Sequence, residues 1–322
     1  MPVQHWQYSP AGMWVAPGRV LSPRDLLVPG TYVPGPATTG VPPNTTLELQ
    51  GAWTTGYDGQ VVTGVRFTGQ VNLKHLNVIF QSCIFEFGPP ITETPPTQTD
   101  MKPLVKAWNA GTSAQFYDCE FFPSVQSVRS AVGIQGHDYE AYRCKFHGTV
   151  DGAMATNQNV KIWQSWIYDL PYYDFDPWQT DGSHNDGIQC QGGGAGFDFS
   201  YCLIQMGYKA TSGIIVTQDV ANVTGLTVHH NWVQSVWDGP QATACAVGLN
   251  IAETKSLGAM TNVDITDNRI SHHSKFKSNH AALIKSNTYD IATITGNVEL
   301  LVGPDGRPLV QGSTTPAKIT RS

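Results

Sequence analysis

Eight short segments of the chain share one pattern of hydrophobic and polar positions. Each has apolar residues at its first, third and eighth positions and a small or amide residue at its sixth. The copies begin at residues 78, 114, 139, 160, 197, 226, 263 and, more weakly, 292. Alternation with a period of two is typical of a half-buried strand. We therefore expect each copy to form a strand of a repeating structure with loops of variable length.

A second set of short apolar segments lies between these copies. They cover residues 103–109, 130–136, 151–157, 186–192, 212–218, 245–251 and 280–286. No amphipathic helix separates the two sets, which excludes βαβ units. The sequence therefore predicts an all-β fold, a single-stranded right-handed parallel β-helix whose coils stack about 4.8 Å apart.

The sixth position of the pattern predicts a column of residues that repeats from coil to coil. Its asparagines are Asn231, Asn268 and Asn297. We expect these to form a ladder of amide hydrogen bonds. Its cysteines are Cys83, Cys119, Cys144 and Cys202. We expect these to be buried as small hydrophobic residues, stacked and without disulfide bonds between them.

The distribution of proline and polar residues suggests three parts of the chain. Residues 1–60 contain nine prolines and are expected to form an irregular cap or attachment segment, with 47–55 as the first strand. Such a cap covers the strand edges at the end of a solenoid. Residues 61–302 form the β-helix, from which a proline-rich loop at 88–103 projects, and residues 303–322 form a polar tail.

Composition and charge remove several classes of function. The net charge is −6 and the basic residues form no run, so nucleic acid is not expected as a partner. No run of apolar residues reaches the length of a membrane span. The opening segment MPVQHWQYSP lacks the layout of a signal peptide. The absence of this layout favours a virion protein released by lysis over a secreted, extracellular one.

The segment 168–186 interrupts the repeat and carries an unusual density of acidic and aromatic residues. Aromatic rings stack on sugars and carboxylates bind hydroxyl groups, so this composition favours a carbohydrate site. The alternative is a folded loop without a ligand, whose aromatic residues pack on the coil below and whose acidic side chains are solvated. The substrate-binding candidates are Trp178, Tyr173 and Tyr172 from this segment, with Gln189, Gln191, Thr217 and Asn250 from the second strand set, where Gln135 and Lys285 continue the predicted groove.

Stacking of the second strand set suggests a catalytic pair. Asp151 and Asp186 are expected in one column about 5 Å apart, the separation of carboxylates in retaining glycosidases. The same alignment predicts Ser130, Ser212, Cys245 and His280 on the flanking coils. The further catalytic candidates are His184, two residues before Asp186, and Asp181. An ordinary Asp-Gly turn is the alternative at both strand entrances.

Metal ions and cofactors have weak support in the sequence. No cofactor is expected. Calcium is an alternative, because Asp174 and Asp176 offer oxygen ligands together with the other acids of 168–186. The histidine pairs at 229–230 and 272–273 point to opposite faces of a strand, which argues against zinc.

The repeats over residues 61–302 resemble the pectate-lyase-like β-helix superfamily, which includes polysaccharide lyases, glycoside hydrolases and phage tailspikes. The stretch DGSHNDGIQCQGG, residues 181–193, is similar to segments of phage members. The resemblance implies a tail-associated homotrimer that contacts other tail or baseplate proteins. A lyase needs clustered cations beside the substrate carboxylate, but Arg143, Lys209, Lys255 and Lys285 are scattered over different coils, which favours a hydrolase.

Three hypotheses about function follow. The leading one is recognition of a bacterial surface polysaccharide, with depolymerisation by hydrolysis, as a phage tail protein. The first alternative is a structural or receptor-binding tail protein without catalysis. The second alternative is a secreted polysaccharide lyase.

Overall fold

The computed structural model describes residues 34–87, 97–98, 101–129, 131–207, 209–235, 247–251, 258–273, 280–284, 291–302, 314–316 and 319–321, with the short strands at 7–8 and 14–15. Every regular element of this described part is a β-strand. The described part contains no helix that is long and apolar enough to cross a membrane. β1 (Gln7–Tyr8) and β2 (Trp14–Val15) form an antiparallel pair.

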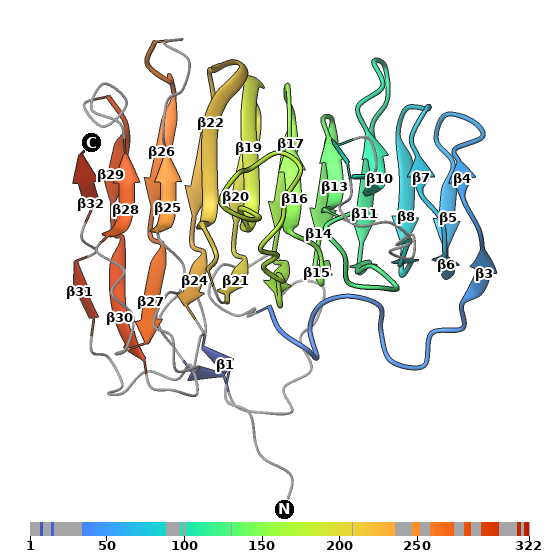
Figure 1. Ribbon diagram of the computed structural model, residues 1–322, viewed down its shortest axis with the longest axis horizontal. Helices are drawn as coiled ribbons and strands as arrows, with labels where there is room; N and C mark the ends of the chain where they lie inside the picture. Colours follow the sequence, from blue (N-terminus) through green and yellow to red (C-terminus); the bar gives the residue numbers. More distant parts are fainter. Residues whose placement is uncertain are drawn as a thin grey trace, which may run out of the picture.

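The strands stack into three long sheets that run the length of the molecule (Figure 1). Each coil of the chain contributes one strand to each sheet in turn, and the neighbours within a sheet are parallel apart from the β30–β31 pair. The predicted right-handed parallel β-helix is confirmed. The sheets are named sheet 1, sheet 2 and sheet 3 below.

The bounds of the strands are as follows. Sheet 1 consists of β4 (Trp53–Thr54), β7 (Val71–Asn72), β10 (Pro103–Ala107), β13 (Val132–Gly136), β16 (Asp151–Ala155), β19 (Asp186–Gly194), β22 (Ser212–Val223), β25 (Val247–Ile251), β28 (His280–Ile284) and β32 (Ile319–Arg321). Sheet 2 consists of β5 (Val61–Thr63), β8 (Val78–Gln81), β11 (Ala114–Tyr117), β14 (Tyr139–Tyr142), β17 (Val160–Trp163), β20 (Phe197–Ser200), β23 (Leu226–His229), β26 (Val263–Thr266) and β29 (Thr293–Thr295). Sheet 3 consists of β3 (Glu48–Gln50), β6 (Val65–Phe67), β9 (Ile84–Phe85), β12 (Glu120–Phe121), β15 (Lys145–His147), β18 (Trp166–Tyr168), β21 (Leu203–Met206), β24 (Trp232–Ser235), β27 (Arg269–His273), β30 (Val298–Val302) and β31 (Thr314–Pro316).

The eight-residue pattern forms a strand of sheet 2, a tight bend and a strand of sheet 3, whereas we expected a single strand. The fifth residue of every copy has a positive φ, from 50° at Arg143 to 68° at Gly296. Seven of these eight residues are not glycine, although this conformation costs free energy for a residue with a Cβ. The hydrogen bonds between coils hold it in place, as at Ser82, whose N–H donates to Tyr117 O at 2.9 Å.

The sixth-position column follows the prediction. Asn231 Nδ2 donates to Asn268 Oδ1 at 3.0 Å, and Asn268 Nδ2 donates to Asn297 Oδ1 at 2.9 Å, so the expected amide ladder is present. The cysteines of the column are buried and free, as predicted. The core beside them contains stacked phenylalanines, with ring centroids 4.7 Å apart for Phe85 and Phe121.

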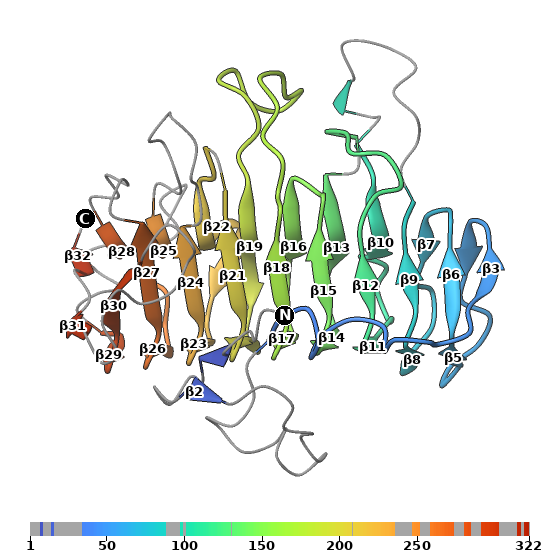
Figure 2. The same ribbon diagram turned by 90° about the horizontal axis from the view of Figure 1, so that it is seen from below.

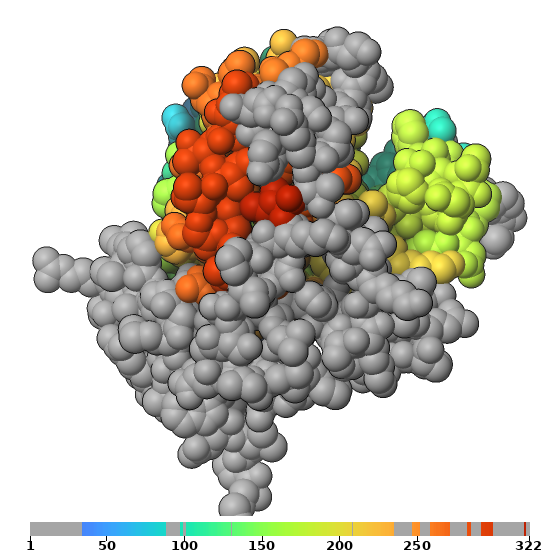
Figure 3. Space-filling model, turned by 90° about the vertical axis from the view of Figure 1, so that its left-hand side faces the viewer, coloured from blue at the N-terminus to red at the C-terminus, as the bar shows by residue number. Residues whose placement is uncertain are grey.

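Two segments outside the coils bear on the predicted parts of the chain. Residues 34–47 run along the flank of the β-helix, past the bend between β14 and β15, to β3 (Figure 2). At this bend, Gly40 N–H donates to Arg143 O at 2.8 Å. β31 and β32 extend sheets 3 and 1 with residues that we assigned to the polar tail. The loop between β18 and β19 stands out from the body of the molecule (Figure 3).

Candidate functional site

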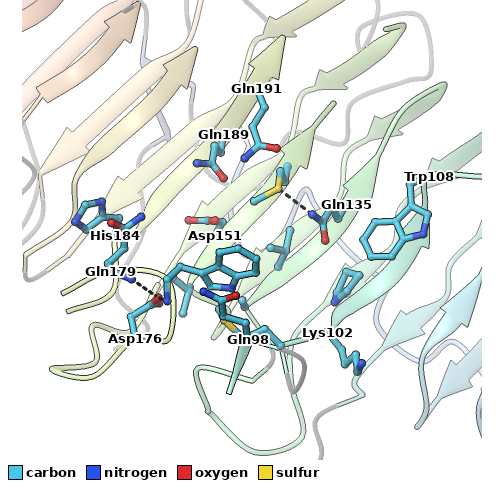
Figure 4. Close-up of a pocket in the computed structure, with 17 residues that line it drawn as sticks. Gln98, Lys102, Trp108, Gln135, Asp151, Asp176, Gln179, His184, Gln189 and Gln191 are labelled. Atoms are coloured by element: carbon cyan, nitrogen blue, oxygen red, sulfur yellow. Dashed lines mark hydrogen bonds between the residues drawn. The ribbon is translucent and has the colours of Figure 1, made fainter. Parts of the chain in front are cut away.

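A cleft of about 620 Å³ lies over sheet 1, between the loop before β10 and the loop that joins β18 to β19 (Figure 4). Strands β10, β13, β16 and β19 provide its floor, and both loops provide its walls. Its lining residues are Gln98, Met101, Lys102, Pro103, Trp108, Ala131, Val132, Gln135, Val150, Asp151, Met154, Asp176, Trp178, Gln179, His184, Gln189 and Gln191.

A column of glycines at the second residue of β13, β16, β19, β22 and β25 aims the first residue of each of these strands away from the core. A Cβ on Gly152 would lie 2.5 Å from Gly187 O and 2.7 Å from the core atom Cγ2 of Ile167, so this position faces inward and has no room for a side chain. Because successive residues of a strand alternate in direction, the residue before the glycine faces outward. Asp151 consequently lines the cleft although its sequence neighbours are buried.

The loop between β18 and β19 is fixed by hydrogen bonds between its own ends. Ser183 N–H donates to Tyr173 O and Tyr173 N–H donates to Ser183 Oγ, both at 2.8 Å. At the loop tip, Asp176 Oδ1 accepts the backbone N–H of Trp178 at 2.7 Å and of Gln179 at 3.2 Å. These contacts hold the Asp176 carboxyl, of which 7% is exposed, at the wall of the cleft.

The two loops also meet. Gln98 Nε2 donates to Pro177 O at 3.1 Å, which joins the loop before β10 to the tip of the other loop. Below this contact, Met101, Met154 and Tyr173 pack on a small apolar cluster that is separate from the main core and includes Val132. The cleft lining therefore combines apolar side chains with polar ones.

The two candidate catalytic aspartates lie on adjacent coils, as predicted. Asp186 N–H donates to Asp151 Oδ1 at 2.9 Å, and both carboxyls are almost completely buried. Burial raises the pKa of Asp186 to about 7. Burial, followed by the charges of Asp186 and Asp176, raises the pKa of Asp151 well above its usual value. The fold therefore favours the protonated form of Asp151 at the cleft floor, relative to an exposed aspartate.

Only one of these two carboxyls lines the cleft. Asp151 does, whereas Asp186 is 2% exposed and lies behind it, beside Ser212 of the next coil. Ser212 and His280 lie in the column of Asp151 and Asp186 on the flanking coils, as predicted. Val132 and Val247 occupy the other two positions, because the register of β13 and β25 is shifted by two residues from our alignment. Ser130 and Cys245 lie outside the described residues.

Two exposed tryptophans line the cleft. Trp178 is 62% exposed and comes from the loop between β18 and β19, and Trp108 is 41% exposed and follows β10. Figure 4 shows Trp108 and His184 at opposite ends, with Asp151 between them. Lys106 Nζ lies 4.4 Å from the centre of the Trp108 ring. Trp178 was among the sequence candidates. Trp108 was not, because it stands at the end of an ordinary strand segment.

The remaining sequence candidates have different positions. Gln189 and Gln191 line the cleft, as does Gln135. The backbone of 183–185 is not a strand, and His184 Nε2 bonds to Asp181 Oδ1 at 3.0 Å, so His184 does not pair with Asp186 as we expected. This bond lowers the pKa of Asp181.

Tyr172 and Tyr173 do not line the cleft. Tyr172 Oη donates to Asp181 O at 2.9 Å, and Lys209 Nζ lies 4.2 Å from the centre of its ring. The Tyr173 side chain packs beneath the cleft floor, and burial raises its pKa to about 12. Both tyrosines support the loop from inside.

The predicted groove column was wrong in its register. The strand register stacks Gln135, Met154, Gln189, Ile215 and Asn250 in one column on successive coils. Gln191 and Thr217 therefore lie two residues beyond this column along their strands. Thr217 is buried and its Oγ1 contacts Asp219 Oδ2 at 2.9 Å. Asn250 is on the column but belongs to a coil beyond the cleft. Lys285 lies outside the described residues.

The structure gives no support to calcium among the residues that it describes. Within this part of the chain, no group of three or more acidic, histidine or cysteine side chains is placed to hold a metal ion. Asp174 has a 94% exposed side chain and lies 3.6 Å from Lys209 Nζ. Asp176 uses one oxygen in the loop turn described above. Of the lyase cations, Lys255 is not described, and Arg143 pairs with Asp118 on another face.

Comparisons with known proteins support no assignment beyond the fold. No family model and no curated protein matches the chain. A solved structure, that of the Dettilon tailspike protein, is similar at 12% sequence identity and a TM-score of 0.41. The match covers 85% of this chain and 60% of the tailspike chain, so this chain spans less than two thirds of that protein's length. The fold assignment rests on the three stacked sheets.

Proposed function

We propose that the protein recognises a bacterial surface polysaccharide and binds it in the cleft over sheet 1. The observation that carries the proposal is the pair of exposed tryptophans, Trp108 and Trp178, in one elongated cleft. Exposed aromatic rings offer flat apolar faces on which sugar rings stack. Exposure of an indole to water is otherwise unfavourable, so two such side chains in one cleft indicate a ligand.

The polar lining suits sugar hydroxyl groups. The amides of Gln98, Gln135, Gln179, Gln189 and Gln191 line the same cleft as the two tryptophans. Each amide offers both donors and acceptors, which matches the hydroxyl groups of a glycan without requiring charge. A few polar groups on an apolar floor are typical of sites that fix the orientation of a ligand.

Hydrolysis of the bound glycan is the second candidate function. Asp151 supports it, because a protonated carboxyl at a cleft floor can donate its proton to a glycosidic oxygen as the bond to the anomeric carbon breaks. A water molecule then attacks that carbon. His184, oriented by Asp181, is the candidate base that accepts the proton of this water. Asp186 acts on Asp151 as a buried neighbour.

Location and assembly remain part of the proposal. Attachment to a phage tail, contact with other tail proteins and a homotrimeric state rest on the resemblance of the repeats to the superfamily of β-helix proteins. A receptor-binding protein without catalysis uses the same cleft and differs only in leaving the glycan intact.

A printed array of bacterial O-polysaccharides and capsular polysaccharides tests the proposal. We expect binding to a small set of them, and binding to none would refute it. The bound polysaccharides are then incubated with the protein and analysed for chain ends. New reducing ends indicate hydrolysis, which Asp151→Asn should slow by at least about a hundredfold. Unsaturated ends absorbing near 235 nm would indicate a lyase and refute the assignment of Asp151, and no new ends would indicate recognition alone.

A further inference from the structure

We propose that Asp176 is a specificity-determining residue that makes the cleft select uncharged glycans and reject glycans that carry carboxylates. The inference rests on the proposed function of the cleft and adds the chemical class of the ligand. Its basis is the balance of charge along the cleft wall, the burial of Asp176 and the neutral character of the other polar groups.

The negative charge beside Trp178 comes from Asp176, which the fold holds in place. Asp176 is 7% exposed, and the N–H groups of Trp178 and Gln179 bind its Oδ1, which fixes the carboxylate beside Trp178. Asp151 also lines the cleft, but burial raises its pKa and favours its uncharged form. In Figure 4, Asp176 lies on the same side of the cleft as His184, and Asp151 lies between this side and Trp108. A sugar that stacks on Trp178 therefore lies close to Asp176.

Positive charge is scarce around the same wall. Among the described residues that line the cleft, Lys102 alone has a permanent positive charge, and its side chain is exposed to solvent at the rim. The sequence from 88 to 100 and from 162 to 208 contains no lysine or arginine. Lys209 is occupied outside the cleft, against Tyr172 and Asp174. Lys106 lies against the Trp108 ring at the other end of the cleft, so a uronate beside Trp178 would meet Asp176 without this cation to offset the repulsion.

The size of the expected effect follows from Coulomb's law. Two like charges about 6 Å apart at an effective dielectric constant of about 20 repel by an amount that corresponds to roughly a hundredfold in affinity. Salt screens such a pair only partly, because Asp176 is almost buried. A hydroxymethyl group in place of the uronate carboxyl avoids this repulsion and finds amide partners among the glutamines.

The test compares one polysaccharide with its own carboxylated form. Each neutral polysaccharide that binds on the array is oxidised at its primary hydroxyl groups, which converts hexose units to uronates. Titration calorimetry then gives the ratio of the two affinities for wild type, for Asp176→Asn and for Asp174→Asn. Asparagine at 176 keeps an oxygen that accepts the Trp178 and Gln179 N–H groups, so the loop is retained while the charge is removed.

We expect the wild type to bind the oxidised form at least about thirtyfold more weakly than the neutral form, and Asp176→Asn to reduce this ratio by at least about tenfold. Asp174→Asn removes the same charge from an exposed position of the same loop and should leave the ratio at the wild-type value. An unchanged ratio in Asp176→Asn would overturn the inference, because the lost hydroxyl rather than the charge would then explain the discrimination. So would array binding to uronate-containing polysaccharides as strong as to neutral ones.

Failure of the inference differs visibly from failure of the proposed function. Binding of acidic glycans overturns the role of Asp176 and leaves glycan recognition in place. Binding of no glycan at all overturns both.

Discussion

The wild type should become less stable as the pH rises because of Asp186, and replacing Asp186 by asparagine should abolish this part of the pH dependence. The Asp186 carboxyl is 2% exposed and its Oδ1 has no hydrogen-bond partner. Burial raises its pKa to about 7, whereas an aspartate in the unfolded chain titrates near pH 3.9. The folded protein therefore holds a proton that the unfolded chain releases throughout the interval between these values.

The sign and size of the effect follow from this difference. The contribution of Asp186 to the unfolding free energy is complete below about pH 4. It is lost as the pH rises from about 4 through about 7, because the unfolded state binds fewer protons than the folded state in this interval. Each pH unit within the interval lowers the unfolding free energy by about 1.4 kcal/mol, so the unfolding free energy of the wild type should fall by about 3 kcal/mol between pH 5 and pH 8. Asp151, whose pKa is also raised, adds a loss of the same sign.

The assay is urea unfolding of the wild type and Asp186→Asn at pH 5 and pH 8. The unfolding free energy of Asp186→Asn minus that of the wild type should increase by about 3 kcal/mol from pH 5 to pH 8. Asp174→Asn, which removes an exposed charge from the neighbouring loop, should follow the wild type at both pH values. A constant difference between the wild type and Asp186→Asn at both pH values would refute the reasoning.

Two further predictions concern the coils. Gly152→Ala should destabilise the fold by about 1 to 3 kcal/mol in urea unfolding, because its Cβ would collide with Gly187 O and Ile167, and an unaffected midpoint would contradict the inward direction of this column. Asn268→Ala should cost at least about 2 kcal/mol, because it removes the acceptor that Asn268 Oδ1 provides to the buried backbone N–H and Nδ2 groups of Asn231, and one donor to Asn297 Oδ1. A cost below about 0.5 kcal/mol would show that the ladder contributes little.

The sequence predicted the coils because their signal repeats. The alternation of apolar residues and the shared sixth position recur in eight copies, and stacking places these positions over one another. The Asn231 to Asn297 ladder and the buried cysteines therefore agreed with the prediction. The pattern did not reveal that each copy bends between two sheets, because residues such as Ser82 and Arg143 adopt a positive φ without being glycine.

The cleft was predicted less well because loops form much of it. Aligning the second strand set by its first residue placed Thr217 in the groove, whereas aligning Gly133, Gly152 and Gly187 would have given the observed register. Trp108 gave no periodic signal. The contact between Gln98 and Pro177 joins residues 79 positions apart, and no local pattern predicts it.

The most direct test of the central claim measures how much each cleft tryptophan contributes to the affinity of the protein for a polysaccharide that binds on the array. Titration calorimetry with Trp108→Ala, Trp178→Ala and the control Phe175→Ala separates the cleft from the rest of the surface, because Phe175 is 46% exposed on the same loop and does not line the cleft. We predict that each tryptophan variant loses about 1 to 3 kcal/mol of binding free energy and that Phe175→Ala binds like the wild type. Wild-type affinity in both tryptophan variants would contradict glycan recognition in this cleft.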